Sequence, residues 1–167
     1  MIQDAFIREG DEFYRKNVGA IILNKNKEIF VGKRFGTQIK VSWQMPQGGI
    51  AENETEEEAL FREMEEEVGI LQNNFSILGK TEDHHYYTIP KKMRKSAWNN
   101  IYVGQRQRWF LLEFKGKDED FNINTEFPEF VEWKWLSPED VIENAISFKR
   151  EIYRKILIEF NLLHENF

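Results

Sequence analysis

The chain has 167 residues, of which 41% are hydrophobic and 14% aromatic, and we expect one folded domain with a sizeable core over residues 1–167. It contains no cysteine, so disulfides, thiolate metal sites and thiol nucleophiles are excluded. The formal net charge of -6 argues against a protein that coats nucleic acid along its length, because such proteins are usually basic.

The first third of the chain predicts strands. Two apolar runs within 18–34 flank a polar turn at 24–27, which is typical of two strands joined by a turn. Residues 43–49 predict a short extended segment, because Pro46 and two glycines interrupt it.

A helix is predicted near 56–68. Thr55 and Glu58 have the spacing of a capping box, and Gly69 follows where a C-terminal cap belongs. The apolar residues of this segment recur every four positions and predict one buried stripe, formed by Leu60, Met64 and Val68. The glutamates of the helix should therefore lie away from the core.

The middle of the chain predicts more strands, with one long interruption. We expect residues 91–104 to form a loop, because no apolar period is visible there. The predicted strands on either side of this loop cover 75–81, 84–90, 108–114 and 130–136.

Two helices are predicted at the end of the chain. Ser137 and Pro138 form a cap residue followed by a proline at the first helical position. A second helix is expected from Ser147, as its cap, to about residue 162. One face of it would carry Phe148, Ile152, Ile156 and Phe160.

The predicted helix at 56–68 brings carboxylates close together. Glu63, Glu66 and Glu67 are three and four residues apart, where like charges destabilise a helix by about a few tenths of a kcal/mol per pair. Divalent metal ions would remove this repulsion, because Mg²⁺ prefers carboxylate oxygens. A solvated acidic face is the common alternative, and these three residues alone leave both open.

Basic islands interrupt this acidic chain. They cover residues 91–95, 105–108 and 148–155. Such a local surface could hold a polyphosphate or the end of a nucleic acid, while ordinary solvated side chains are an equally good interpretation of each island.

The glutamates belong to a longer pattern with fixed spacing. Gly48 is followed after five residues by Glu54, and seven residues separate Glu54 from Arg62. The chain then continues with Glu63, Met64, Glu65, Glu66, Glu67, Val68, Gly69 and Ile70. At every fixed position residues 48–70 resemble the box of the Nudix hydrolases, and so many fixed positions make the match specific.

The resemblance implies a fold and a metal-dependent activity. The fold would be an α/β/α sandwich with a central mixed β-sheet, and Arg62 would pair with Glu54 to brace the box. Glu66 or Glu67 would accept a proton during catalysis. Several Mg²⁺ or Mn²⁺ ions would be held by Glu63, Glu66, Glu67, the Gly48 carbonyl and, outside the box, Glu129. Glu56, Glu57, Glu58 and Glu65 match no fixed position, so we expect them to be solvated.

Residues outside the box narrow the resemblance. From about Tyr14 to Phe160 the chain resembles the bacterial RNA pyrophosphohydrolases and the related dinucleoside polyphosphate hydrolases, on segments such as "SWQMPQGGI" and "SFKREIYRK". The resemblance implies substrate-binding roles for Arg15, Arg34, Tyr87, Gln105, Phe148 and Lys149. For Phe148 a place in the core is an equal alternative.

These observations lead to one expected function and two alternatives. We expect hydrolysis of a phosphoanhydride at the 5′-triphosphate end of RNA, which leaves a monophosphate end. The alternatives are hydrolysis of a dinucleoside polyphosphate, such as diadenosine tetraphosphate, and a Nudix module that binds nucleotides or RNA without catalysis. The N-terminus lacks the features of a signal peptide and no apolar run has bilayer length, so we expect a cytoplasmic protein that does not contact a membrane.

Overall fold

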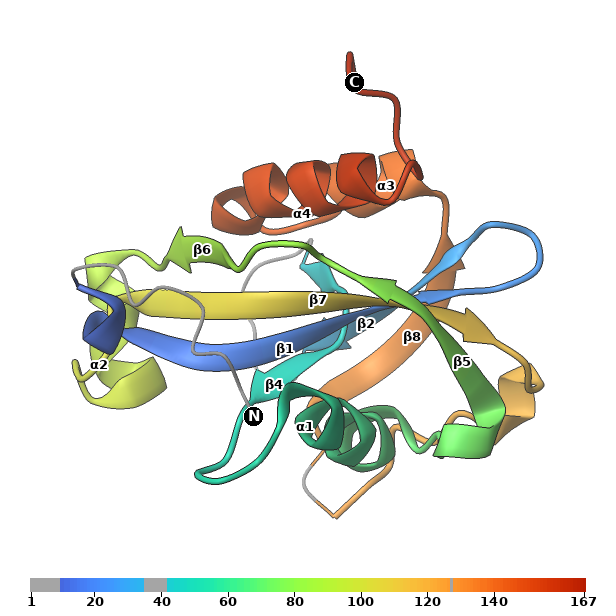
Figure 1. The fold of residues 1–167 in the computed structure, drawn as a ribbon, viewed down its shortest axis with the longest axis horizontal. Helices are drawn as coiled ribbons and strands as arrows, with labels where there is room; N and C mark the ends of the chain where they lie inside the picture. The colour runs from blue at the N-terminus through green and yellow to red at the C-terminus, as the bar shows by residue number, and fades with distance from the viewer. Residues whose placement is uncertain (1–9, 35–41, 127) are drawn as a thin grey trace.

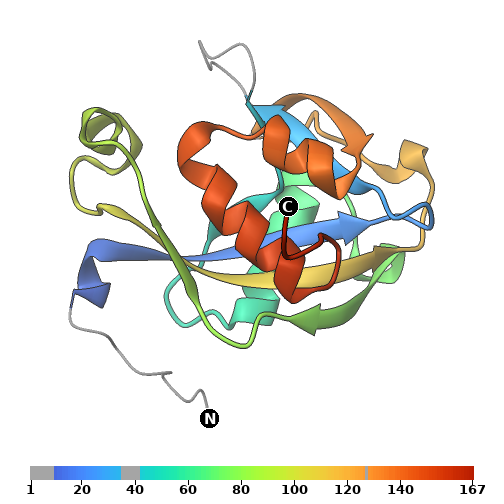
Figure 2. The same cartoon turned by 90° about the horizontal axis from the view of Figure 1, so that it is seen from above.

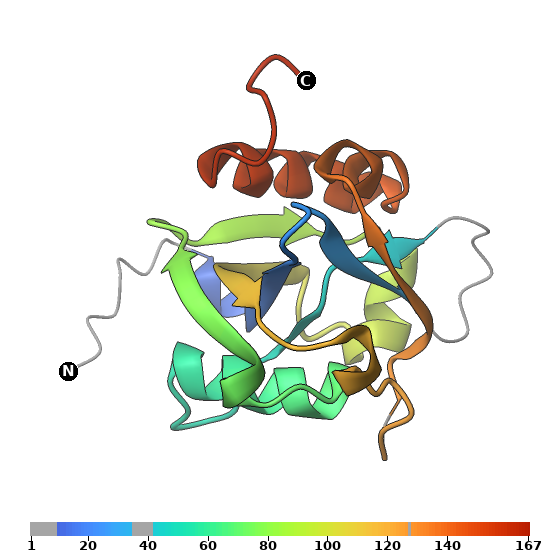
Figure 3. The same ribbon diagram turned by 90° about the vertical axis from the view of Figure 1, so that its right-hand side faces the viewer.

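The computed structural model describes residues 10–34, 42–126 and 128–167. A mixed β-sheet lies between helix α1 (Glu56–Glu63) on one face and helices α3 (Pro138–Glu143) and α4 (Ser147–Glu159) on the other (Figure 1). Figure 3 shows these three layers edge on. The predicted α/β/α sandwich with a central mixed sheet is therefore confirmed. Within the described ranges, no helix has the length and apolar character needed to cross a bilayer.

The centre of the sheet is a parallel pair of long strands. Ten consecutive residues of β1 (Tyr14–Leu23) pair with β7 (Gly104–Phe114), starting with Tyr14 opposite Gly104. The main strand order is β3-β2-β1-β7-β5, and the remaining pairs are antiparallel. The other strands are β2 (Ile29–Arg34), β3 (Trp43–Gln44), β4 (Gln47–Gly49), β5 (Phe75–Lys80), β6 (His85–Thr88) and β8 (Phe130–Leu136).

Both faces of β1 are buried because helices cover both sides of the sheet. Val18, Ala20 and Ile22 belong to the core under α1, while Ile21 and Leu23 belong to the core under α4. This alternation follows from the two-residue period of a strand. A strand buried on both faces appears in the sequence as a continuous apolar run, as the segment 18–23 does.

Helix α1 begins and ends as predicted, but its last turn changes geometry. The Thr55 hydroxyl accepts a hydrogen bond from the Glu58 amide at 3.1 Å, and Gly69 ends the segment in the left-handed region with φ 76. Residues Met64–Val68 form a π-helical turn instead of continuing the α-helix. Such turns are frequent at functional sites because they change which side chains face a given direction.

The predicted loop at 91–104 is wrong. Residues Lys91–Trp98 form helix α2, and β7 begins at Gly104 rather than at 108. Met93 and Trp98 pack against the core on the α4 side, so tertiary contacts stabilise a helix with few apolar residues. Figures 1 and 2 show α2 at the end of the sheet where β1 begins.

The two C-terminal helices are confirmed with one correction. The Ser137 hydroxyl accepts a hydrogen bond from the Asp140 amide at 3.2 Å and caps α3. Ser147 was expected to cap α4, but it is the first helical residue, and Ile146 occupies the cap position without a side-chain hydrogen bond. α4 ends at Glu159, earlier than expected, and its buried face also includes Tyr153. Figure 2 shows α4 lying across the sheet.

Candidate active site

A pocket of about 220 Å³ is lined by residues of α1, α2 and α4. β1, β4, β6 and β7 also contribute to its wall. Most of the residues expected at the site line it, namely Arg15, Arg34, Gly48, Glu63, Glu67, Tyr87, Gln105, Glu129, Phe148 and Lys149. The topology thus brings together side chains from across the whole chain.

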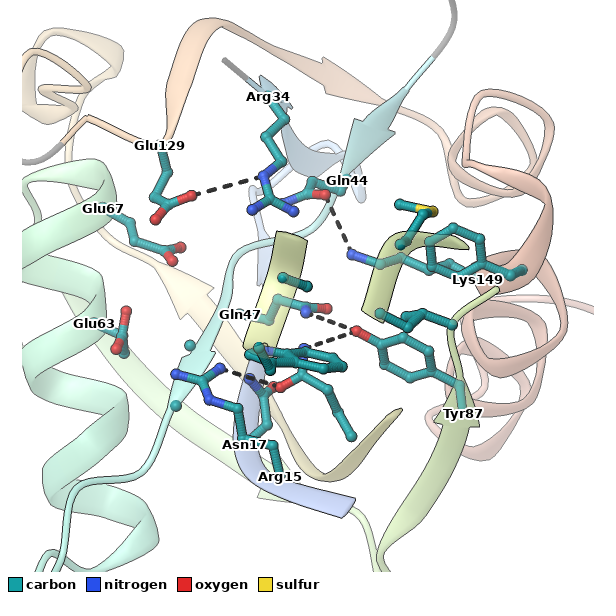
Figure 4. Close-up of a pocket in the computed structure, with 18 residues that line it drawn as sticks. Arg15, Asn17, Arg34, Gln44, Gln47, Glu63, Glu67, Tyr87, Glu129 and Lys149 are labelled. Atoms are coloured by element: carbon teal, nitrogen blue, oxygen red, sulfur yellow. Dashed lines mark hydrogen bonds and ion pairs between the residues drawn. The ribbon is translucent and has the colours of Figure 1, made fainter. Parts of the chain in front are cut away.

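The pocket has an acidic side and an aromatic side. Figure 4 shows Glu63, Glu67 and Glu129 on one side, and Tyr87 and Lys149 on the other. Arg15 and Arg34 lie between the two sides (Figure 4). A cationic middle flanked by carboxylates and by aromatic rings suits a molecule that joins a polyphosphate to a base.

The acidic side holds two buried carboxylates, one of which has an oxygen without a partner. Glu63 and Glu67 are both buried, and Glu67 Oε2 has no hydrogen-bond partner among the described residues. Gly48 lies against Glu63 so closely that a Cβ atom there would fall 1.9 Å from Glu63 Cδ. The missing side chain of Gly48 therefore lets the backbone of β4 approach this carboxylate.

Burial changes the proton affinity of both carboxylates. Burial raises the pKa of Glu67 well above its ordinary value, and the charges of Glu63 and Glu129 raise it further. Burial also raises the pKa of Glu63, although its hydrogen bond and ion pair with Arg62 oppose this shift. Two adjacent buried acids of this kind are stabilised by a bound cation or by a shared proton.

These donors fit a divalent cation that is completed by its substrate. Within the described ranges, no three His, Asp or Glu side chains form a group that could hold a metal ion by themselves. Mg²⁺ does not require such a cage, because it is usually bound by one or two carboxylates, water and substrate phosphates. The unpartnered buried oxygen of Glu67 and the hard oxygens of Glu63 supply that smaller set.

Glu66 does not join the other carboxylates in the pocket wall. Its side chain is 58% exposed and contacts Arg62 at 3.1 Å. The turn from α-helical to π-helical geometry at Met64 places Glu67 inward and leaves Glu66 outside. The sequence spacing alone did not distinguish between these two neighbours.

Arg62 connects the box helix to the loop before it. Its guanidinium donates to both carboxylate oxygens of Glu54, at 2.8 and 2.9 Å, and to the Gly49 carbonyl at 2.8 Å. It also donates to Glu63 at 2.8 Å. The pair of Arg62 with Glu54 is present as the resemblance implies. Through its other hydrogen bonds, Arg62 also fixes Glu63 and Gly49 relative to Glu54.

This pair should make the stability of the protein depend on pH in acid. The hydrogen bonds from Arg62 lower the pKa of the Glu54 carboxyl from 4.5 to about 2. A lowered pKa stabilises the fold above pH 4.5, and that contribution is lost as the pH falls toward 2. We expect Glu54→Gln to be about 1 kcal/mol less stable at pH 7, since solvent screens the pair, and equal to wild type near pH 2. Urea unfolding of both proteins across this range measures the difference, and a difference that did not shrink in acid would contradict the prediction.

Polar side chains in the middle of the pocket hold one another in place. The Tyr87 hydroxyl accepts hydrogen bonds from Gln47 Nε2 at 3.0 Å and from Gln105 Nε2 at 2.9 Å. Gln105 Oε1 accepts one from Arg15 at 3.3 Å. Arg15 in turn covers Gly49, where a Cβ atom would fall 2.1 Å from Nη2. The network orients Arg15 toward the acidic side without neutralising it.

The aromatic side is formed by α4 and β6. Phe148 stacks on Tyr87 with ring centroids 6.2 Å apart, and it also packs against the core. Phe148 therefore lies partly in the core, while its contact with a base stays a prediction. Lys149 is buried and donates to Gln44 Oε1 at 3.2 Å. Burial, and then the charge of Arg34, lower the pKa of Lys149 to about 7.

Several pocket residues were not anticipated from the sequence. Gln44 and Gln47 flank Pro46 in a segment that was interpreted only as extended structure, although two glutamines beside a glycine pair are unusual for a core strand. The residues on α2 were missed because a loop was expected there. The full set of unanticipated residues is Asn17, Gln44, Gln47, Gly49, Ile89, Met93, Ala97 and Trp98.

Glu56 is not the solvated residue that was expected. Its carboxylate accepts from Arg108 Nε at 3.3 Å and lies 3.0 Å from His84 Nε2. Arg108 is buried and also donates to the carbonyl of Thr81 at 2.6 Å. This contact ties the first turn of α1 to β7 and helps to fix the helix that carries the pocket glutamates.

Comparisons with known proteins agree with this geometry. The NUDIX domain family matches residues 13–156. RNA pyrophosphohydrolase from Orientia tsutsugamushi (strain Boryong) is 46% identical over 149 residues, which cover 89% of this chain and 91% of that protein. RNA pyrophosphohydrolase from Rickettsia conorii is 45% identical over 150 residues, which cover 90% and 91%.

Two solved structures share the fold at low sequence identity. The C. elegans Ap4A hydrolase binary complex superimposes with a TM-score of 0.62 at 20% identity, covering 88% of this chain and 99% of that one. The E. coli dihydroneopterin triphosphate pyrophosphohydrolase gives 0.64 at 19% identity, covering 87% and 98%. Because the NUDIX family matches most of the chain, including the box and the residues of the pocket, the chain belongs to the Nudix family.

Proposed function

We propose that this protein is an RNA pyrophosphohydrolase, which hydrolyses a phosphoanhydride at the 5′-triphosphate end of RNA and leaves a monophosphate end. Two relatives with this name are 46% and 45% identical to this chain over 89% and 90% of its length. The observation that carries the proposal is the pocket itself, in which a buried carboxylate with one unpartnered oxygen, two arginines and an aromatic wall face one another. A polyphosphate attached to a base satisfies all three.

Members of the Nudix family typically depend on divalent metal ions. We infer that Mg²⁺ or Mn²⁺ ions, several per site, would be held by the residues that the resemblance implied, Gly48, Glu63, Glu66, Glu67 and Glu129. When bound, such ions neutralise phosphate charge and make a water molecule easier to deprotonate. Glu66 now contacts Arg62, so its part in this set requires that ion pair to open.

The protein's own groups divide the remaining work. Glu67 is better placed than Glu66 to accept the proton of the attacking water, because it faces the pocket and has an unpartnered oxygen. The water oxygen forms a bond to phosphorus, the bond from that phosphorus to the bridging oxygen breaks, and the leaving phosphate carries away the electron pair. Arg15 and Arg34 stabilise the negative charge that develops, since a guanidinium can donate to two phosphate oxygens.

The proposal includes a single domain over residues 1–167, of which the NUDIX match covers 13–156. The expected cytoplasmic location stays a prediction. Measuring phosphate release from both substrates tests the two alternative functions. Diadenosine tetraphosphate also joins a polyphosphate to bases, so its rate must be compared with that of RNA. A binding module would release no phosphate from either molecule.

Removal of divalent metal should abolish the activity and leave the fold intact. The two cores consist of apolar side chains, so folding does not depend on an ion. We expect triphosphorylated RNA to release phosphate with Mg²⁺ but not with excess EDTA, while the thermal melt stays within a few degrees. Diadenosine tetraphosphate is measured beside it and should be the poorer substrate. Hydrolysis that continues in metal-free buffer would contradict the metal role, and faster hydrolysis of diadenosine tetraphosphate would favour the alternative substrate.

Truncation of Phe148 should reduce activity on RNA selectively. Its ring stacks on Tyr87 at the pocket wall, and a base stacked on such a ring gains about 1–3 kcal/mol. We expect Phe148→Ala to slow hydrolysis of a triphosphorylated dinucleotide about tenfold or more relative to ATP, which has no second base. Phe160→Ala is the control, because Phe160 packs on the same core but does not line the pocket. Equal losses on both substrates for Phe148→Ala would remove the base-stacking role.

A further inference from the structure

Helix α2 carries a group of positive charges in an acidic protein. Its eight residues include Lys91, Lys92 and Lys95 and no acidic residue. All three lysines are exposed, and within the described ranges none of them forms an ion pair or a side-chain hydrogen bond. Arg94 differs, because it is half-buried and donates to the Ile89 carbonyl at 3.1 Å. We call Lys91, Lys92 and Lys95 the α2 lysines.

Two of the α2 lysines lie where positive charge is unfavourable for their own helix, and only Lys95, in the last turn, lies where the helix dipole favours it. Lys91 and Lys95 are four residues apart, where like charges repel. Lys91 and Lys92 also occupy the first turn, at the positive end of the helix dipole, after Pro90, which provides no side-chain cap. The helix is held instead by apolar packing of Met93 and Trp98 and ends at Asn99 in the left-handed region with φ 52. An anionic partner from outside the chain would offset this repulsion.

The position of α2 connects these charges to the pocket. Met93, Ala97 and Trp98 of this helix line the same pocket as the catalytic carboxylates and Phe148. One side of α2 thus forms pocket wall, while its lysines do not line the pocket and are exposed to solvent. Figure 2 shows α2 set apart from α4 at the end of the sheet, so neither α3 nor α4 covers it.

We propose that the α2 lysines bind backbone phosphates of the RNA downstream of its 5′ end. The inference rests on the proposed function and assigns a second contact region to the same substrate. An RNA strand whose 5′ end enters the pocket must continue out of it, and α2 forms part of the pocket wall. Eight helical residues extend about 12 Å, which is enough to follow a short run of phosphates. The net charge of -6 would otherwise repel RNA, so a local basic surface also orients the approaching end.

A charge-matched pair of variants tests the proposal. The first variant replaces the α2 lysines, as Lys91→Gln, Lys92→Gln and Lys95→Gln. The control replaces three exposed lysines at the other end of the β1 and β7 pair, as Lys25→Gln, Lys115→Gln and Lys117→Gln. Ten paired residues separate the two ends, which is about 30 Å. Both variants change the net charge equally, so a difference between them reports position.

Two measurements are made on each variant. Binding of a 5′-hydroxyl RNA decamer is followed by fluorescence anisotropy at several salt concentrations, which requires no catalysis. We expect the α2 variant to bind at least tenfold more weakly at low salt and to lose about 2 from the slope of log affinity against log salt, since each phosphate contact on a single strand contributes about 0.7. In kinetics, kcat/KM for a triphosphorylated decamer should fall by a similar factor, while that for a triphosphorylated dinucleotide should stay within twofold.

The outcomes separate this inference from the proposed function. Wild-type affinity in the α2 variant, or an equal loss in the control, would overturn the role of the α2 lysines. An equal loss on decamer and dinucleotide would also overturn it, because the lysines would then act on the pocket. Lysine-dependent binding of the decamer without hydrolysis of any triphosphorylated RNA would support the contact region and reject only the proposed activity. A thermal melt no lower than that of wild type confirms that both variants fold.

Discussion

Glu67→Gln is expected to lower the rate of RNA hydrolysis by more than about 100-fold, because changes that act only indirectly on a metal site already cost about 10- to 100-fold. Glu67 faces the pocket and has a buried oxygen without a partner, so it is the carboxylate best placed to hold a cation or accept a proton. Glutamine keeps the shape but removes the charge. Retention of activity within a few-fold would mean that Glu67 has neither role.

The same change should stabilise the protein in metal-free buffer. The pKa of Glu67 is raised, so its charged form costs stability at neutral pH, and this cost disappears as the pH falls and the carboxyl is protonated. Glu67→Gln removes the cost, and each 1 kcal/mol gained corresponds to about 2–4 °C in melting temperature for a chain of this size. We therefore expect a higher melting temperature for the variant at pH 8 and a smaller gain near pH 5. A lower melting temperature at pH 8 would contradict the assigned burial of the charge.

Glu57→Gln is the control for both measurements. Glu57 lies in the same helix, but its side chain is partly exposed and, among the described residues, pairs with Lys80 at 3.3 Å. Surface ion pairs contribute about 0–1 kcal/mol. We expect the activity of Glu57→Gln to be within twofold of wild type and its melting temperature to be nearly unchanged.

Gly48→Ala is expected to abolish most activity with little loss of stability. The added Cβ would fall 1.9 Å from Glu63 Cδ and 2.1 Å from one of its oxygens, so the carboxylate must move. A carboxylate is the end of a flexible side chain and can rotate away, so we expect the free energy of unfolding to fall by only about 1–2 kcal/mol. The displaced Glu63 would then no longer lie against the backbone of Gly48, and the rate should drop about 100-fold or more.

Gly79→Ala is the matched control on another strand of the same sheet. A Cβ at Gly79 would meet only Phe160, at 3.8 Å, which is an ordinary contact. Rates and thermal melts of the two alanine variants, measured side by side, decide the matter. Full activity in Gly48→Ala would show that the close approach of β4 to Glu63 is not needed for catalysis. Loss of the folded state in Gly48→Ala would show that this approach serves the scaffold.

The features that the sequence determined by itself are those encoded by neighbouring residues. Thr55, Glu58 and Gly69 lie close together along the chain, so the start and end of the box helix were predictable from capping geometry. The spacing from Gly48 to Ile70 was sufficient to indicate the family, because it is a continuous segment. The apolar runs in β1 and in the second half of β7 likewise predicted strands.

Tertiary structure decided which side chains enter the pocket. Glu66 and Glu67 are adjacent and chemically identical, and only the π-helical turn packed against the sheet places one inside and the other outside. The contact of Lys149 with Gln44 joins residues 105 positions apart, so it depends on sheet topology and not on any local pattern.

Helix α2 could not be predicted from the sequence, because tertiary packing stabilises it. Its sequence shows no apolar period, and two lysines occupy its first turn, where positive charge is unfavourable. Met93 and Trp98 stabilise it only when the core surface around Tyr87 and Ile89 has formed. Local propensity is a weak determinant for a helix of eight residues, since the cost of nucleation is recovered only through packing. The basic island was visible in the sequence, whereas its position beside the pocket was decided by that packing.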